Sequence, residues 1–145
     1  MKLSINVLKK GFLLVLFMFL INCDLPKDSN KSWESVKQNG LKVGIVYTSK
    51  NSKQHDLINS EYKLVKNFAK RHGLKITSIE DSETTLIDKL KNYKLNVVIG
   101  GFDKKSLWKK AVGMTAMYDG KHVIFITKGE NELLFHLNKF LYANK

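Results

Sequence analysis

Four short β-rich runs alternate with helical patterns over residues 41–145, and this alternation limits the fold more than any other feature of the chain. The runs occupy residues 41–47, 74–80, 96–101 and 122–127. The first and third contain consecutive apolar residues, which is typical of strands buried on both faces. Alternating strands and helices predict right-handed crossovers and a mainly parallel sheet covered on both sides. We therefore expect a three-layer α/β sandwich with a four-stranded sheet.

The helical patterns between these runs carry capping residues where helices should begin. Polar residues 59–61 precede the first pattern, and Ser82 precedes the second. Asp103 is placed to cap a short third helix, and Glu130 or Asn131 opens the last one. Side-chain oxygens at such positions accept hydrogen bonds from the free N–H groups of a first helical turn. The predicted order is β-α-β-α-β-α-β-α.

The N-terminus has the pattern of an export signal. Residues 11–21 form an apolar run behind a lysine-containing start without acids. The run is too short to cross a bilayer, which takes about 20 residues, and it matches the apolar region of a secretory signal. It ends in Leu20, Ile21, Asn22 and Cys23, and this ending resembles a bacterial lipobox, with Asn22 where that motif has Gly, Ala or Ser. An uncleaved signal anchor and another kind of processing remain as alternatives.

The lipobox resemblance implies that residues 1–22 are a signal peptide and that Cys23 carries lipid. The chain would then be anchored in a bacterial membrane, on the extracytoplasmic side of the cell envelope. Residues 24–40 are polar, contain the only proline and hold just two apolar residues of note, Trp33 and Val36. We interpret residues 23–40 as a flexible tether and residues 41–145 as the folded lobe.

Composition narrows the possible functions. The net charge is +12, yet Arg71 is the only arginine among 25 basic residues. Specific reading of nucleic acids relies on the guanidinium group, so a solvated lysine-rich surface explains the charge better. One cysteine excludes a disulfide framework, and the sequence lacks the usual hydrolase, zinc-protease and nucleotide-loop motifs. We expect no catalytic residues, no metal, no cofactor and no nucleic-acid partner.

Topology supplies the one candidate binding site. Ligands of open parallel sheets sit beyond the carboxyl ends of the strands, where the strand order reverses. The candidate residues after the first strand are Tyr47 and Thr48, and those after the third are Gly100, Gly101, Phe102 and Asp103. A plainer interpretation also fits: the two glycines make a turn, the aspartate caps a helix and the tyrosine fills the core.

Three stretches resemble family 3 extracellular solute-binding proteins. They are residues 59–76 (NSEYKLVKNFAKRHGLKI), 96–118 (NVVIGGFDKKSLWKKAVGMTAMY) and 122–141 (HVIFITKGENELLFHLNKFL). The resemblance implies one lobe of a type II periplasmic-binding-protein fold, with strand order 2-1-3-4 and the direction of the last strand left open. Members of this family have two lobes that close around a small polar solute. Here the second lobe is missing after Thr127.

The departures from that family shape the expected function. Its carboxylate-binding arginine falls near residues 106–109, where this chain has Trp108, so we add Trp108 to the candidate edge. The resemblance implies a lipoprotein that binds a small polar solute without catalysis. A homodimer or a partner protein that replaces the second lobe is a second version. The alternative is a structural or envelope-interaction lipoprotein that has lost ligand binding.

Overall fold

The computed structural model describes residues 28–49 and 52–144, so the predicted signal peptide and Cys23 lie outside the described residues. The elements in chain order are α2 (Ser32–Asn39), β1 (Leu41–Val46), α3 (Lys53–Arg71), β2 (Ile76–Asp81), α4 (Glu83–Lys91), β3 (Val97–Asp103), the 3₁₀ turn η2 (Leu107–Lys110), β4 (Gly113–Met114), β5 (His122–Ile126) and α5 (Asn131–Tyr142). No helix in these ranges has the length and apolar content of a membrane span.

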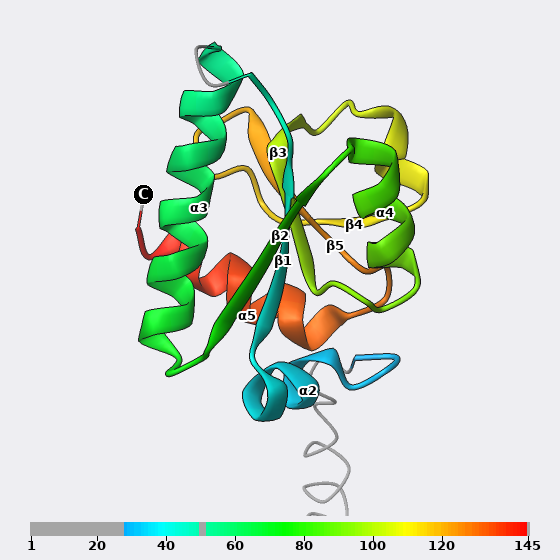
Figure 1. The fold of residues 1–145 in the computed structure, drawn as a ribbon. Helices are drawn as coiled ribbons and strands as arrows, with labels where there is room; N and C mark the ends of the chain where they lie inside the picture. Colours follow the sequence, from blue (N-terminus) through cyan, green and yellow to red (C-terminus); the bar gives the residue numbers. More distant parts are fainter. Residues whose placement is uncertain (1–27, 50–51, 145) are drawn as a thin grey trace, which may run out of the picture.

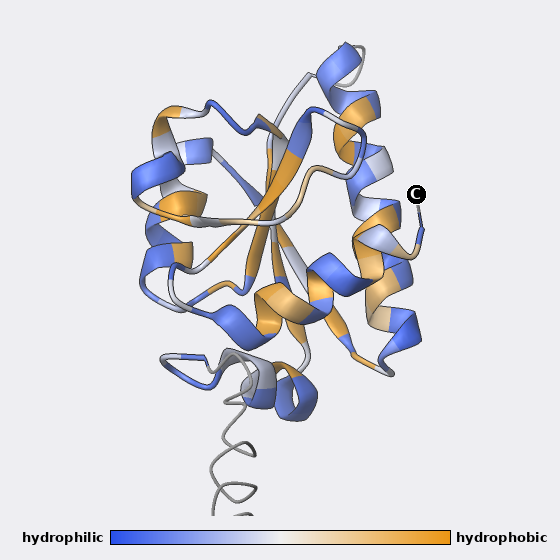
Figure 2. Cartoon of the chain, turned by 180° about the vertical axis from the view of Figure 1, so that it is seen from behind, coloured by the Kyte–Doolittle hydropathy of each residue, from blue (hydrophilic) through white to orange (hydrophobic). Residues whose placement is uncertain are grey.

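One sheet of five strands, in the order β2-β1-β3-β5-β4, forms the centre of the lobe. Strand β1 pairs in parallel with β2 and with β3. Figure 1 and the reverse view in Figure 2 show α3 and α5 on one face and α4 on the other. The strands at the centre are mostly apolar in Figure 2. The predicted three-layer α/β sandwich is therefore confirmed.

The sheet is five-stranded and mixed, not the predicted four-stranded and mainly parallel sheet, and it settles the direction of the last strand, which the sequence left open. A two-residue edge strand, β4, adds a fifth strand, and β5 pairs antiparallel with both β3 and β4. The predicted neighbours are correct, because β2-β1-β3-β5 is the order 2-1-3-4. The direction follows from the connection after β3. The helical piece of this connection is η2, with four residues, whereas a parallel crossover is usually made by a full α-helix packed on the sheet.

Residues 28–40, which the sequence assigned to the tether, fold onto the lobe instead. Helix α2 buries Trp33 and Val36, and the Trp33 ring stacks on His136 of α5 at a centroid distance of 4.0 Å. The sequence pattern was misleading because α2 is short and polar outside its buried residues. A short amphipathic helix gains most of its stability from the surface against which it packs, and much of this surface belongs to α5, more than 90 residues away in sequence.

Two carboxylates fix the start of this segment. Asp28 accepts hydrogen bonds from the backbone N–H of Trp33 (2.6 Å) and from those of Glu132 (2.5 Å) and Leu133 (3.0 Å) in the first turn of α5. Glu130 accepts in return from the N–H groups of Asn30 (3.0 Å) and Ser32 (3.1 Å). Asp28, which precedes α2, thus satisfies free N–H groups at the start of α5, and Glu130, which precedes α5, satisfies a free N–H group at the start of α2.

Helix α3 begins earlier than predicted. Ser52 caps it by accepting from the His55 N–H at 3.1 Å, so residues 59–61 lie inside the helix. The apolar pattern begins with Leu57 and Ile58, which extend the buried stripe by one turn. Glu61, which the sequence suggested as part of a cap, is therefore buried in the middle of α3.

Candidate functional site

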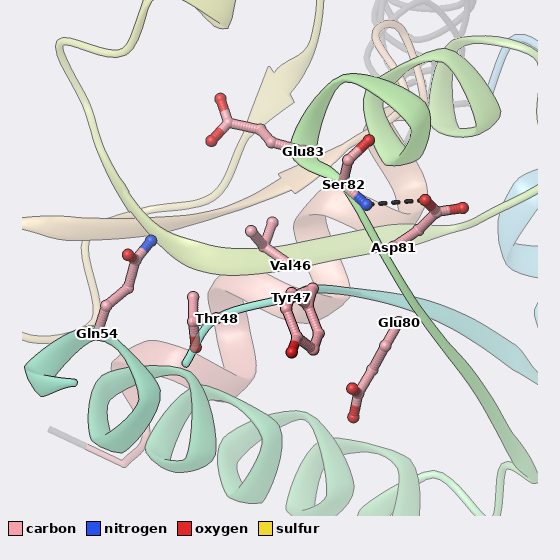
Figure 3. Close-up of a pocket in the computed structure, with 8 residues that line it drawn as sticks. All are labelled: Val46, Tyr47, Thr48, Gln54, Glu80, Asp81, Ser82 and Glu83. Carbon is pink, nitrogen blue, oxygen red and sulfur yellow. Dashed lines mark hydrogen bonds between the residues drawn. The ribbon is translucent and has the colours of Figure 1, made fainter. Parts of the chain in front are cut away.

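An open hollow of about 570 Å³ lies beyond the carboxyl ends of β1 and β2, and we call this region the strand-end edge. Parallel pairing brings these ends together, since Val46 is in register with Asp81. The residues that line the hollow come from both strands, from the start of α3 and from the start of α4 (Figure 3). They are Val46, Tyr47, Thr48, Gln54, Glu80, Asp81, Ser82 and Glu83.

Three carboxylates give the strand-end edge a negative character. Glu80, Asp81 and Glu83 are three of the 13 acidic residues in a chain of net charge +12. The Asp81 carboxylate is 2.8 Å from the Lys89 ammonium group, which lowers the pKa of Asp81. The Glu83 carboxylate accepts from the Trp108 indole N–H at 2.5 Å. Glu80 is exposed and forms no ion pair with another described residue, so its carboxylate is available to a ligand.

Tyr47 and Thr48 occupy the predicted edge. Both line the 570 Å³ hollow, and both also line a second hollow of about 320 Å³ toward α3. His55 and Asn59 of α3 line that second hollow. The Tyr47 side chain is 71% exposed, so it does not fill the core, as the plainer interpretation of the sequence suggested. An exposed ring beside carboxylates provides a face for a ligand or partner.

Gly100, Gly101 and Phe102 do not line either hollow. The Phe102 ring is buried and stacks on Phe125 at a centroid distance of 3.9 Å. A Cβ atom on Gly100 would lie 2.6 Å from Val46, and one on Gly101 would lie 2.7 Å from the Leu57 side chain. Gly101 also has φ +67°, which glycine adopts without strain. Both glycines are thus required by packing and backbone geometry.

Glu61, which the sequence suggested as part of a helix cap, holds the end of β3 from inside α3. Its carboxylate is fully buried and accepts from the backbone N–H groups of Gly100 (3.0 Å) and Gly101 (2.7 Å) and from the Tyr118 hydroxyl (2.8 Å). Burial raises the pKa of Glu61 to about 7, although these hydrogen bonds act in the opposite direction. A signal was present: Glu61 stands between Ile58 and Val65 on the apolar stripe of its helix, where an unpaired carboxylate is rarely found.

Asp103 and Trp108 organise the turn that follows β3. The Asp103 carboxylate accepts from the Lys105 N–H at 2.7 Å, and its carbonyl accepts from the Ser106 N–H at 2.9 Å. Trp108 reaches the strand-end edge through its bond to Glu83, whereas Asp103 is absent from the lining of the hollow. Within residues 28–49 and 52–144, no group of three metal-ligating side chains is close enough to hold a metal ion.

Neither a protein-family model nor a curated protein sequence matches this chain. Solved structures do. The arginine-bound form of domain 1 from TmArgBP is similar with a TM-score of 0.63 and 24% identity, covering 75% of this chain and 97% of that domain. A point mutant of the same arginine-bound domain gives a TM-score of 0.64 at 24% identity, covering 77% of this chain and 96% of that one.

A third similar structure is the truncated, arginine-bound ArgBP from T. maritima. Its TM-score is 0.61 at 14% identity, and the match covers 77% of this chain and 100% of that chain. At these identities the similarity establishes the fold. This chain has the α/β fold of one solute-binding lobe, in agreement with the single-lobe expectation from the sequence.

Proposed function

We propose that this chain is a non-catalytic binding lobe that takes up a small solute carrying a cationic group at the strand-end edge. A lipid on Cys23 would hold it on the extracytoplasmic side of a bacterial membrane. The observation that carries the proposal is the 570 Å³ hollow, whose lining includes Glu80, Asp81 and Glu83 together with the exposed Tyr47. Carboxylates form short, strong hydrogen bonds with ammonium and guanidinium groups, and an aromatic face attracts cations.

The charge of the whole chain makes this edge distinctive. At a net charge of +12, most of the surface repels a cation, so three carboxylates in one hollow create a local site of opposite sign. The similar domain 1 from TmArgBP is described as an arginine-bound form. That likeness supports the idea that a single lobe of this fold is sufficient for binding.

The solute's cationic group should contribute more than any carboxylate it carries. The resemblance to family 3 proteins places their carboxylate-binding arginine near Trp108, and the uncharged Trp108 side chain cannot form an ion pair with a solute carboxylate. An amine or guanidine without a carboxylate should therefore bind at least as well as the corresponding amino acid. This expectation gives the proposal a sharp test.

Thermal unfolding with a panel of solutes tests the site. We expect agmatine and L-arginine to stabilise the chain by about 2.7 kcal/mol at 100 times their Kd. Citrulline, whose side chain is neutral where that of arginine is charged and whose cationic group is its α-ammonium alone, should stabilise the chain far less. The double variant Glu80→Gln, Glu83→Gln should lose the stabilisation, because neutral amides cannot pair with the cation. The control variant Glu34→Gln removes an exposed carboxylate on α2 and should still be stabilised by the solutes.

Two outcomes would contradict the proposal for a cationic solute. Equal stabilisation by citrulline would show that charge is not recognised, and an unchanged response of the double variant would place binding elsewhere. A chain that no solute stabilises would instead favour a protein covering the exposed Tyr47, such as a second copy of this chain.

Mass spectrometry of the mature N-terminus tests the anchor separately. We expect the mature chain to begin at an acylated Cys23, since lipid chains contribute about 0.8 kcal/mol per buried CH₂ and together hold a protein firmly. Cys23→Ala should leave the chain unacylated. A mature protein that retains residues 1–22, or that begins elsewhere, would refute lipidation without affecting the solute proposal.

A further inference from the structure

A leucine surrounded by lysines protrudes from the turn after β3. The Leu107 side chain is 98% exposed, the highest value among the exposed large hydrophobic side chains of the described residues. The four nearest lysines in sequence are also exposed. No acidic residue occurs between Asp103 and Asp119. We call this surface the η2 patch, and it consists of Lys104, Lys105, Leu107, Lys109 and Lys110.

The turn that presents Leu107 is held in place by hydrogen bonds. The Ser106 hydroxyl caps η2 by accepting from the Trp108 N–H at 3.3 Å, and the Trp108 carbonyl accepts from the Ala111 N–H at 2.8 Å. The Trp108 ring packs against the core, and its indole N–H is bonded to Glu83 of α4. Because Trp108 is fixed inward, Leu107 points outward as part of an ordered structure.

The η2 patch is connected to the place where the described chain begins. The Lys128 ammonium group donates to the Lys110 carbonyl at 3.1 Å. The next residue, Gly129, accepts from both the N–H and the hydroxyl of Ser29, at 3.3 and 3.2 Å. The yellow η2 segment in Figure 1 lies across the sheet from α3. These contacts link the η2 patch, through Lys128 and Gly129, to Ser29 near the start of the described residues.

We propose that the η2 patch docks on a membrane surface rich in anionic lipid, with Leu107 entering the interface and the lysines contacting headgroup phosphates. Membrane-surface segments combine apolar side chains with lysines in this way. Protein interfaces are depleted in lysine and centred on larger apolar areas, so a protein partner fits this surface less well. The contact is separate from solute binding and does not depend on it.

The test places a polarity-sensitive fluorophore at position 107 of the full chain. The variant Leu107→Cys is made with Cys23→Ser, so that the label has one attachment site. The control probe is placed at Asn67, an exposed residue of α3, by Asn67→Cys. Both are mixed with phosphatidylcholine vesicles and with vesicles in which about one lipid in three is phosphatidylglycerol, at low salt.

We expect a blue shift of the probe at position 107 with the anionic vesicles only, and no shift of the probe at position 67. Residues 1–22 are the same in every variant, so the difference between the two kinds of vesicle reports on the charge of the lobe. Each lysine near an anionic surface contributes about fivefold, or ~1 kcal/mol. The double change Lys109→Gln, Lys110→Gln should therefore reduce the ratio of docked to undocked chains about 25-fold.

Three results would overturn the lipid proposal. The probe at position 107 could respond equally to both vesicles, the probe at position 67 could respond just as strongly, or the double lysine variant could dock as before. A probe at position 107 that ignores both vesicles but is shielded when the chain self-associates would assign the patch to a second copy instead. The substitutions at residues 67, 107, 109 and 110 lie on exposed side chains, and unchanged thermal unfolding will show that each variant is folded.

Discussion

Replacing Trp33 by alanine should lower the free energy of unfolding by about 3–5 kcal/mol, the usual cost of removing a large aromatic side chain from a core. The Trp33 side chain is 5% exposed. Its ring stacks on His136 and contacts Phe68 at a centroid distance of 6.2 Å. If residues 28–40 were a flexible tether, the same change would have almost no effect. Urea unfolding at constant pH distinguishes a packed helix α2 from a flexible tether.

The control for this prediction lies on the opposite face of the same helix. Gln38 is exposed, and Gln38→Ala preserves helix propensity, so its unfolding free energy should stay within about 0.5 kcal/mol of the parent chain. A Trp33→Ala variant that unfolds at the same urea concentration as Gln38→Ala would show that α2 does not contribute to the stability of the lobe.

Glu61→Gln should make the chain more stable above neutral pH by up to about 3 kcal/mol. A protonated glutamic acid and a glutamine present the same groups to their neighbours. One oxygen accepts from the Gly100 and Gly101 N–H groups, and the other position can donate to the Tyr118 oxygen. The glutamine avoids the cost of burying a negative charge, which is the main reason why the pKa of Glu61 is raised to about 7.

The sign of the pH dependence follows from the two states of the chain. Glu61 releases its proton near pH 7 when folded and near its ordinary pKa of about 4.3 when unfolded. Between these values the folded state holds a proton that the unfolded state has lost, so stability falls as pH rises through this range. The parent chain should therefore lose stability up to about pH 7 and then level off, whereas Glu61→Gln should not show this loss.

Unfolding free energies measured at several pH values test this prediction. Asp81 and the two histidines near Trp33 also have shifted pKa values, but they are present in both chains. The difference in unfolding free energy between Glu61→Gln and the parent chain therefore reports on the titration of Glu61. Glu34→Gln serves as the control, because Glu34 is exposed. A constant difference between the two chains at every pH would contradict a titrating buried carboxyl group.

Two of the eight residues that line the hollow, Tyr47 and Thr48, could be predicted from sequence. Tyr47 and Thr48 follow an apolar run that had to be a buried strand, and in a parallel sheet the end of such a strand lies at the binding edge. Glu80, Asp81 and Glu83 were missed because only the ends of the first and third strands were considered. The end of β2 lies beside that of β1 in the same parallel pair, so its carboxylates share the hollow.

Gly100, Gly101 and Phe102 illustrate the opposite error. Their position after a buried strand predicted contact with a ligand, but the two glycines pack against Val46 and Leu57 and Phe102 stacks in the core. A glycine pair looks the same in sequence whether a ligand or a helix approaches it. Here a helix approaches the pair, and its residue Glu61, which accepts from the Gly100 N–H, is 39 residues away in sequence.

The sequence by itself located four of the five strands and the helices α3, α4 and α5, because apolar periodicity reports local conformation and burial together. The order of β2, β1, β3 and β5 was implied by the resemblance to family 3 solute-binding proteins, and the structure has this order. Tertiary structure alone decided that β5 runs antiparallel, that Trp33 is buried and that Glu61 is enclosed. These features depend on contacts between residues far apart in the chain, such as the Asp28 and Leu133 bond across 105 positions, and no local pattern encodes them.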